Sequence, residues 1–266
     1  MTIQTYLVSG AAGALGTATT QILLGRGHRV VATDLDAEAL TETAGRRCWT
    51  QERLVIRALD VRRPEAWDEV LEEVTTTWGL DVAIHMAGHI HGAPFWTQPA
   101  EEAIQHLESN ALGVFLGTAA AAKRMVEVGR GHIINVASMA ALMPSPGFAF
   151  YAGAKYAVRG FSLAAAAELA AHGVAVTVAC PATIDSPMYE SQKAYYAATQ
   201  GRLASTPLTV DAVVEALLSP RVLRSRPVEV NIPPLKGVIA RGADLFPGAF
   251  NRLLTTLRGS EDSEGP

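Results

Sequence analysis

The segment YLVSGAAGALG, residues 6–16, joins an apolar run to a cluster of glycines and then to a helix-like stretch. Gly10, Gly13 and Gly16 fit the spacing GxxGxxG, whereas the spacing GxxxGxG would place Ala14 where its second glycine should be. In either spacing the small residues permit a tight turn, let the backbone approach a pyrophosphate and aim a helix N-terminus at its negative charge. Closely spaced glycines more often form an ordinary turn, so the surrounding sequence must decide.

The glycine cluster belongs to a chain in which apolar, β-branched runs alternate with helix-like segments as far as about Asn231, where the fold should be complete. Strands are predicted at residues 6–9, 28–33, 54–59, 82–86, 132–137, 174–179 and 228–231. The longer helices are predicted at 16–26, 64–78, 101–128 and 152–171. This alternation predicts βαβ units with right-handed crossovers. The expected fold is therefore α/β, a Rossmann-type doubly wound parallel sheet of about seven strands with helices on both faces.

One domain is the simplest division of the chain, because no internal repeat and no Gly/Ser linker interrupts it. We expect residues 1–258 to form this domain and the small and acidic residues 259–266 to form a frayed tail. The domain would end in a helix whose apolar face comprises Phe250, Leu253, Leu254 and Leu257. That face is expected to pack on the body or on a partner subunit rather than on a membrane.

Composition limits the cellular compartment and the binding partners that we expect. The net charge of −4 and a pI near 6.0 show no basic excess that would attract nucleic acid. Cys48 and Cys180 have no metal-ligand spacing and fit a reducing compartment, without excluding a disulfide. The N-terminus lacks the pattern of a signal peptide, and no apolar run reaches the roughly 20 residues of a membrane span. We therefore expect a cytoplasmic protein that acts on a small molecule, without integral membrane contact.

Asp34 ends the second predicted strand, in the sequence VVATDLD. A carboxylate at this position can accept hydrogen bonds from both hydroxyls of an adenosine ribose, and it would repel a 2′-phosphate. Neither Gly13 nor Leu35 supplies a cation that would neutralise such a phosphate. Asp34 therefore predicts NAD as the cofactor. The alternative is that Asp34 only caps the helix that follows.

Tyr151 and Lys155, in FYAGAKYAVRGF (150–161), are four residues apart and therefore share one face of a predicted helix. Ser138 directly follows the strand predicted at 132–137 and is expected at the same sheet edge as the glycine loop. The lysine ammonium would lower the pKa of the phenol from its ordinary value of about 10, and would also hold the nicotinamide ribose. The serine hydroxyl would position the substrate oxygen. Together these three residues predict an alcohol/carbonyl redox site.

The loop, the acid and the Ser-Tyr-Lys set occur in an order that resembles the short-chain dehydrogenase/reductase family, in its short single-domain form, as far as about Met188. The resemblance implies that Asn110 completes a catalytic tetrad by holding a water that links the lysine to solvent. It also implies a substrate lid at about 186–207, and a homodimer or homotetramer formed through the helices of Asn110 and Tyr151. The full predicted set of cofactor-binding residues is Gly10, Gly13, Ala14, Leu15, Gly16, Asp34, Leu35, Asp60, Val61, Ala87, Gly88, Tyr151, Lys155, Pro181, Ile184 and Ser186.

Three places depart from the family pattern. Ala14 replaces the middle glycine of the loop, His85 and Met86 replace two asparagines, and Ala182 replaces a glycine. The additional methyl group of Ala14 would crowd a pyrophosphate, which Gly13 beside it can relieve. We expect these departures to weaken individual contacts rather than to abolish cofactor binding.

His85, His89 and His91 are close together in HMAGHIHG (85–92) and raise the question of a metal site. No nearby carboxylate or cysteine completes a set of ligands, and a strand end would splay the imidazoles apart. We therefore predict no metal. His89 or His91 could instead reach the substrate, and the plainer alternative is that they are loop or core residues.

These observations predict an NAD-dependent oxidoreductase that interconverts a secondary alcohol and a ketone. Methionines and aromatic residues near the site slightly favour an apolar or cyclic substrate. Two other functions stay open. A sugar-nucleotide epimerase or dehydratase would share the glycine spacing, but little chain is left for its substrate domain. A non-catalytic, NAD-sensing regulatory protein would bind the nucleotide without chemistry, but the complete tetrad argues against it.

Overall fold

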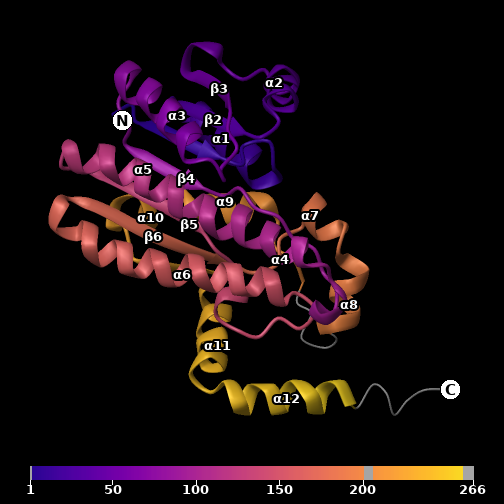
Figure 1. Ribbon diagram of the computed structural model, residues 1–266. Helices are drawn as coiled ribbons and strands as arrows, with labels where there is room; N and C mark the ends of the chain where they lie inside the picture. Colours follow the sequence, from indigo (N-terminus) through magenta and orange to yellow (C-terminus); the bar gives the residue numbers. More distant parts are fainter. Residues whose placement is uncertain (1, 201–205, 260–266) are drawn as a thin grey trace.

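A parallel β-sheet forms the centre of the protein. The computed structural model describes residues 2–200 and 206–259. Within them the strands are β1 (Thr5–Ser9), β2 (Arg29–Asp34), β3 (Leu54–Ala58), β4 (Val82–His85), β5 (Gly131–Val136), β6 (Val174–Pro181) and β7 (Glu229–Ile232). They form one sheet in the order β3-β2-β1-β4-β5-β6-β7, and every neighbouring pair is parallel (Figure 1). The predicted Rossmann-type fold is confirmed.

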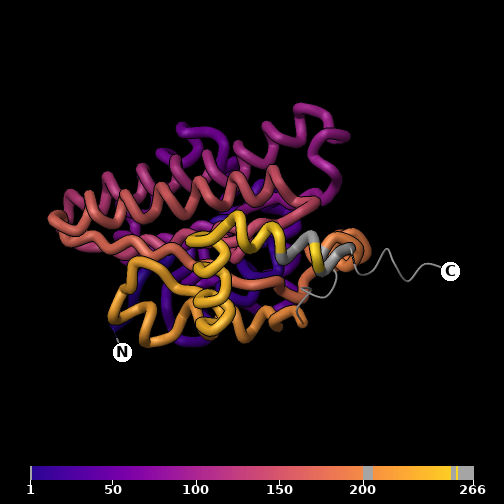
Figure 2. The backbone as a smooth tube through the Cα atoms, turned by 90° about the horizontal axis from the view of Figure 1, so that it is seen from below, coloured from indigo at the N-terminus to yellow at the C-terminus, as the bar shows by residue number. Residues whose placement is uncertain are grey.

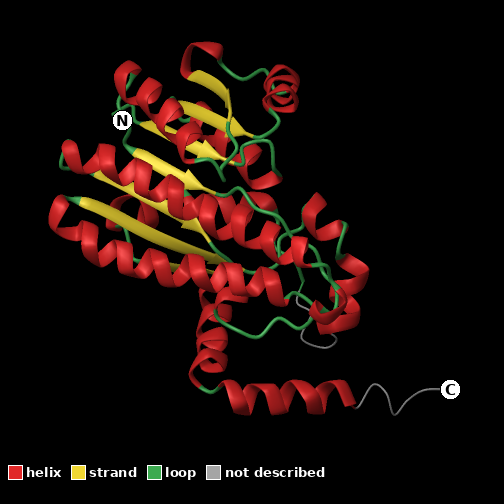
Figure 3. Ribbon diagram, in the orientation of Figure 1, coloured by secondary structure: helices red, strands yellow, loops and turns green. Residues whose placement is uncertain are grey.

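Helices cover both faces of this sheet (Figure 3). One face is covered by α1 (Ala14–Gly25), α2 (Ala37–Arg46), α9 (Val210–Leu217) and α10 (Pro220–Ser225), which bury Leu23, Leu40, Val213 and Val222. The other is covered by α3 (Pro64–Thr77), α5 (Gly113–Glu127) and α6 (Ala149–Leu169), which bury Trp67, Met125 and Ala165. The sheet therefore has an apolar layer on each side.

The strand β1 shows why a parallel sheet forms here. All five of its residues are buried. Tyr6 and Val8 pack into one apolar layer, and Leu7 between them packs into the other. A strand that is apolar on both sides fits only in a sheet covered on both faces. The strand order reverses between β1 and β4, and at such a reversal open α/β sheets leave a crevice at the carboxyl ends of their strands.

The single helix predicted at 101–128 is divided in the structure. It consists of α4 (Ala100–Leu107), a π-helical turn η3 (Glu108–Leu112) and α5. A π-helical turn inserts an additional residue into the helix and commonly occurs at functional sites. Apolar periodicity does not reveal it, because a turn of five residues is too short to show a period of its own. The turn contains Asn110, whose contacts are described below.

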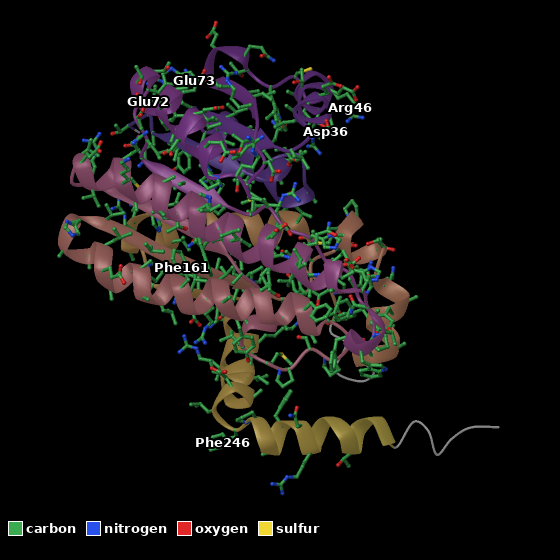
Figure 4. All side chains as sticks on the ribbon, in the orientation of Figure 1. Asp36, Arg46, Glu72, Glu73, Phe161 and Phe246 are labelled. Carbon is green, nitrogen blue, oxygen red and sulfur yellow. The ribbon has the colours of Figure 1, made fainter. Side chains whose placement is uncertain are left out.

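Two C-terminal helices, α11 (Pro234–Leu245) and α12 (Pro247–Gly259), follow β7 and project away from the sheet (Figures 1 and 2). The expectation that the fold is complete near Asn231 is therefore wrong, because Ala240 of α11 is 1% exposed and belongs to a buried cluster beside β6. Phe246, at the turn between the two helices, is exposed (Figure 4). Gly259 ends α12, and the rest of the predicted tail lies outside the described residues, as do the side chains of Leu253, Leu254 and Leu257.

Among the described residues, no helix is both long enough and apolar enough to span a membrane.

Candidate active site

A cavity of about 890 Å³ follows the carboxyl ends of the strands, from the glycine loop to α11. Every residue to which the sequence assigned a catalytic or cofactor-binding role lines this cavity. The structure therefore brings together, around one space, residues from Gly10 to Ser186 that are far apart in the chain. Their individual roles stay predictions, and the geometry of each group follows.

The glycine loop fits the close approach that its sequence predicts. Gly10 has a φ of +73°, and a Cβ there would lie 2.7 Å from the backbone of Ala87. A Cβ on Gly16 would lie 2.2 Å from the carbonyl oxygen of Gly10. No side chain caps the N-terminus of α1, and its first turn contains no acidic residue. Its free backbone N–H groups therefore face the cavity as a site suited to a pyrophosphate.

Asp34 lies at the carboxyl end of β2 and lines the cavity. Its Oδ2 accepts a hydrogen bond from the N–H of Ala12 at 2.9 Å, which fixes the carboxylate beside the glycine loop. The alternative role as a helix cap is wrong, because Asp36 caps α2 by accepting from the N–H of Ala39 (Figure 4). The carboxylate of Asp34 is thus in position to bind the hydroxyls of a ribose.

Arg62 also lines the cavity, and it is a cation that was not singled out from the sequence. Its guanidinium donates to both carboxylate oxygens of Asp60, at 2.8 and 2.7 Å. This hydrogen bonding lowers the pKa of Asp60. Because Arg62 is paired with Asp60, it is not a free cation for a 2′-phosphate.

Tyr151, Lys155 and Ser138 meet at the carboxyl ends of β5 and β6. Tyr151 and Lys155 lie one turn apart on α6, and the Lys155 Nζ is 5.6 Å from the centre of the Tyr151 ring. Lys155 Nζ donates to the carbonyl oxygen of Val136 at 3.0 Å. Ser138 Oγ accepts from the N–H of Ala140 at 3.1 Å, and the hydroxyl also interacts with the Tyr151 phenol. The three side chains can therefore act on one bound molecule.

The expectation that Lys155 lowers the pKa of Tyr151 is wrong for the protein chain by itself. Burial raises the pKa of Tyr151 to about 12, and the interaction with Ser138 offsets this only in part. Burial also lowers the pKa of Lys155 to about 8. The ammonium lies over the ring and is bonded to Val136 rather than to the phenol oxygen, which explains the difference. The chain alone holds the phenol in its protonated form.

Asn110 is fully buried and holds the backbone beside the cavity. Its Nδ2 donates to the carbonyl of His89 at 2.8 Å, and its Oδ1 accepts from the His89 N–H at 3.1 Å. A Cβ on Gly88 would lie 2.5 Å from Asn110 Oδ1 and 3.7 Å from Lys155 Nζ. Asn110, Gly88 and Lys155 are therefore neighbours, as the tetrad requires. The relay water implied by the family resemblance stays a prediction.

His85, which replaces a family asparagine, lies in the core and not in the cavity wall. It is 1% exposed, packs edge-on against Trp67 with ring centres 5.1 Å apart, and neither ring nitrogen has a hydrogen-bond partner among the described residues. Burial lowers its pKa to about 3. The imidazole is thus neutral in the folded protein, although it would titrate at about 6.5 in the unfolded chain.

This burial predicts an acid-labile fold. Above pH 6.5 His85 is neutral in both states and adds no pH dependence; below it, only the unfolded chain takes up the proton. The free energy of unfolding should therefore fall by about 2 kcal/mol from His85 between pH 7 and pH 5. Urea denaturation at several pH values measures how steeply the free energy of unfolding falls with pH, and this dependence should be weaker in His85→Asn than in the wild type. Part of the dependence remains in both proteins because of His132, whose pKa burial lowers to about 4. An equal pH dependence in the wild type and in His85→Asn would contradict a neutral, buried His85.

His89, Glu102 and His106 form a cluster that the sequence did not reveal, because α4 supplies two of them. Their nearest ligand atoms lie within 4.8 Å of one another. However, His106 Nδ1 donates to the carbonyl oxygen of Glu102 at 2.7 Å, and its Nε2 accepts from the N–H of His91 at 3.1 Å. Both ring nitrogens of His106 are therefore engaged, which leaves too few free ligands for a metal site of ordinary type. His89 also lines the cavity, while His91 does not.

The predicted lid forms α7 (Pro187–Glu190) and α8 (Lys193–Gln200), and its residues 201–205 lie outside the described part of the chain. Hydrogen bonds between described residues connect it to the body. The N–H of Gly92 donates to Gln192 Oε1 at 2.9 Å, and the Tyr196 and Thr183 hydroxyls are 2.9 Å apart. Side chains of Met188, Tyr189 and Tyr196 face the cavity.

Known proteins resemble this chain in sequence. Residues 4–197 match the sequence pattern of the family described as short chain dehydrogenase. A 2-(R)-hydroxypropyl-CoM dehydrogenase of Xanthobacter autotrophicus is 33% identical over 189 residues, which cover 68% of this chain and 75% of that protein. A 1-deoxy-11-beta-hydroxypentalenate dehydrogenase of Streptomyces exfoliatus is 31% identical over 219 residues, which cover 81% of this chain and 80% of that protein. A probable oxidoreductase EphD of Mycobacterium tuberculosis is 34% identical over 181 residues, but the match spans only 31% of its length.

Solved structures show the same architecture. A single-residue variant of the actinorhodin polyketide ketoreductase, crystallised with NADPH, superposes with a TM-score of 0.77 at 25% identity, over 86% of this chain and 95% of the other. A short-chain dehydrogenase from Streptomyces avermitilis superposes with a TM-score of 0.79 at 20% identity and covers 100% of both chains. The second likeness concerns the fold alone.

Proposed function

Because this chain belongs to the short-chain dehydrogenase/reductase family, we propose that it is an oxidoreductase that interconverts a secondary alcohol and a ketone, with NAD as the hydride carrier. The observation that carries the proposal is the position of Tyr151, Lys155 and Ser138 in the same cavity as the glycine loop and Asp34. One bound dinucleotide could then meet the acid at one end and the tyrosine at the other. The 31–33% identical relatives whose names denote alcohol dehydrogenases support this reaction class.

NAD rather than NADP is proposed from the adenosine end of the cavity. Asp34 presents a fixed carboxylate where a 2′-phosphate would have to lie, and Arg62 is paired with Asp60. Like charges in direct contact oppose binding. The ketoreductase crystallised with NADPH does not decide the question for this chain, since cofactor choice depends on the residues after β2.

The chain's own residues are suited to the proton transfer that accompanies hydride transfer. Bound NAD would supply the hydride acceptor. Ser138 would hold the substrate oxygen by a hydrogen bond, and Tyr151 would exchange the proton with that oxygen. Lys155 would bind the nicotinamide ribose and bring its positive charge toward the phenol, which offsets the burial that otherwise raises the phenol pKa to about 12. Asn110 keeps the His89 segment in place beside the lysine.

A cofactor-difference screen tests the proposal. The absorbance of reduced nicotinamide would be followed with NAD or NADP across steroids, cyclic alcohols, dihydrodiols and sugars, and the reverse reaction with the matching ketones. We expect turnover with NAD on at least one apolar or cyclic secondary alcohol. NAD binding in calorimetry without turnover of any panel member would instead support a nucleotide-sensing protein.

A further inference from the structure

One face of α11 forms part of the cavity wall, on the side of β6. Lys236, Ile239 and Ala240 of this helix line the cavity. Ala240 packs in the same buried cluster as Met139 and Ala182, which neighbour Ser138 and Pro181 in the sequence. Residues four apart share one helix face, so Lys236 lies one turn from Ala240 on the cavity side. Lys236 thus lines the same cavity as Ser138 and Tyr151 but belongs to a different element.

The charge of Lys236 is not neutralised by any other described residue. The other cation of α11, Arg241, pairs with Glu229 at 2.8 Å, and Glu229 also binds Arg159 at 2.9 Å. Asp244 lies 3.5 Å from Arg159. The carboxylates of the neighbouring elements are therefore already paired. Lys236 is half-buried and forms no ion pair or hydrogen bond within the described part of the chain.

Apolar and aromatic side chains line much of the cavity that contains Lys236. They include Met143, Phe148, Met188, Tyr189, Tyr196, Ile239 and Phe250. The carboxylates that line the cavity belong to Asp34, at the end of β2, and Asp60, just after β3, whereas α11 follows β7 at the other edge of the sheet. A half-buried cation beside apolar side chains attracts an anion more strongly than the same cation fully in water. A largely apolar cavity with one unpaired lysine in its wall therefore favours an apolar molecule with a negative group.

We propose that Lys236 is an anion-binding residue of the substrate pocket, and that the substrate is an apolar cyclic or aromatic alcohol or ketone with a carboxylate remote from the reacting carbon. This inference rests on the reaction proposed above. An α-hydroxy acid does not fit, because its carboxylate is attached to the reacting carbon, beside Ser138 and Tyr151. Lys236 belongs to α11 and takes part in none of the described interactions of Ser138, Tyr151 or Lys155, so the anion it would bind is placed apart from the reacting carbon.

Matched acids and esters test this inference by binding, independently of turnover. The probes are cyclohexanones that carry a carboxylate on a chain of one to three carbons opposite the ketone, each with its methyl ester. Their affinities for the full chain loaded with reduced dinucleotide would be measured by calorimetry. We expect one acid to bind roughly 10- to 100-fold more tightly than its ester, as a charge-assisted hydrogen bond predicts. Lys236→Met should remove most of this difference, and Lys236→Arg should retain part of it.

Lys193→Met is the matched control, because Lys193 is a lid cation that pairs with Glu190 at 2.8 Å and does not line the cavity. It should leave the difference between acid and ester in place. Equal affinities of acid and ester for the wild type would refute the anion site. So would a Lys236→Met variant that weakens acid and ester alike, or that weakens dinucleotide binding instead. If the acids bind through Lys236 but no ketone is reduced, the proposed reaction fails while the anion site stands.

Discussion

Tyr151→Phe is expected to lower turnover of a secondary alcohol by about 10²- to 10⁴-fold, the usual contribution of a general acid or base. Phenylalanine keeps the aromatic ring and its packing, so the fold should be intact. It removes the oxygen to which we assign the proton exchange with the substrate. The kcat, followed by the absorbance of reduced nicotinamide, should fall while the Kd of the dinucleotide, measured by calorimetry, stays within a few-fold of wild type.

Tyr156→Phe is the matched control for this result. Tyr156 is the neighbour of Lys155 on α6, but its hydroxyl bonds to Asp244, at 3.4 Å near the surface. Loss of this long bond should leave kcat unchanged within about two-fold. Full activity in Tyr151→Phe, or an equal loss in both variants, would mean that the phenol of Tyr151 is not the proton-exchanging group.

Asp34→Asn is expected to change the preference between NAD and NADP by about 100-fold or more. Asparagine keeps an oxygen that can accept from the N–H of Ala12, so the glycine loop should retain its shape. The change removes the charge that strengthens hydrogen bonds to the ribose hydroxyls and that repels a 2′-phosphate. Each charge-assisted hydrogen bond contributes about 1.5–3 kcal/mol, or roughly 10- to 100-fold. The measurement is kcat/KM for NAD divided by kcat/KM for NADP.

Asp36→Asn serves as the control in the same loop. Asparagine is as good a helix cap as aspartate, so α2 should remain capped. The ratio of kcat/KM for the two cofactors should stay close to that of the wild type. A wild-type enzyme that already prefers NADP would contradict the role given to Asp34.

The sequence predicted the sheet well because its strands carry apolar side chains on both faces. Runs such as Tyr6 to Val8 are apolar without interruption, and glycines occur in the turn that follows. The predicted site residues also line one cavity, because the sheet order brings together the carboxyl ends of β1, β4, β5 and β6. Chain order and spacing contain that information, since each residue lies at a strand end or on the next helix.

Other features depend on contacts that spacing does not contain. The π-helical turn at Asn110 has only five residues, too few for an apolar pattern to reveal it. Glu102 and His106 approach His89 only because α4 packs against the segment that follows β4. The raised pKa of Tyr151 follows from burial, which the helical spacing to Lys155 could not reveal. In the sequence Lys236 is an ordinary charge near the C-terminus, and only the position of α11 shows that it lines the cavity.

A crystal structure of the protein with bound NAD tests the central claim most directly. We predict the nicotinamide ribose within hydrogen-bond distance of Lys155 Nζ and Tyr151 OH, and the adenosine ribose bound by the carboxylate of Asp34. The pyrophosphate should lie against the first turn of α1. A dinucleotide bound elsewhere, or one whose nicotinamide lies away from Tyr151 while Lys155 contacts only Val136, would contradict the account.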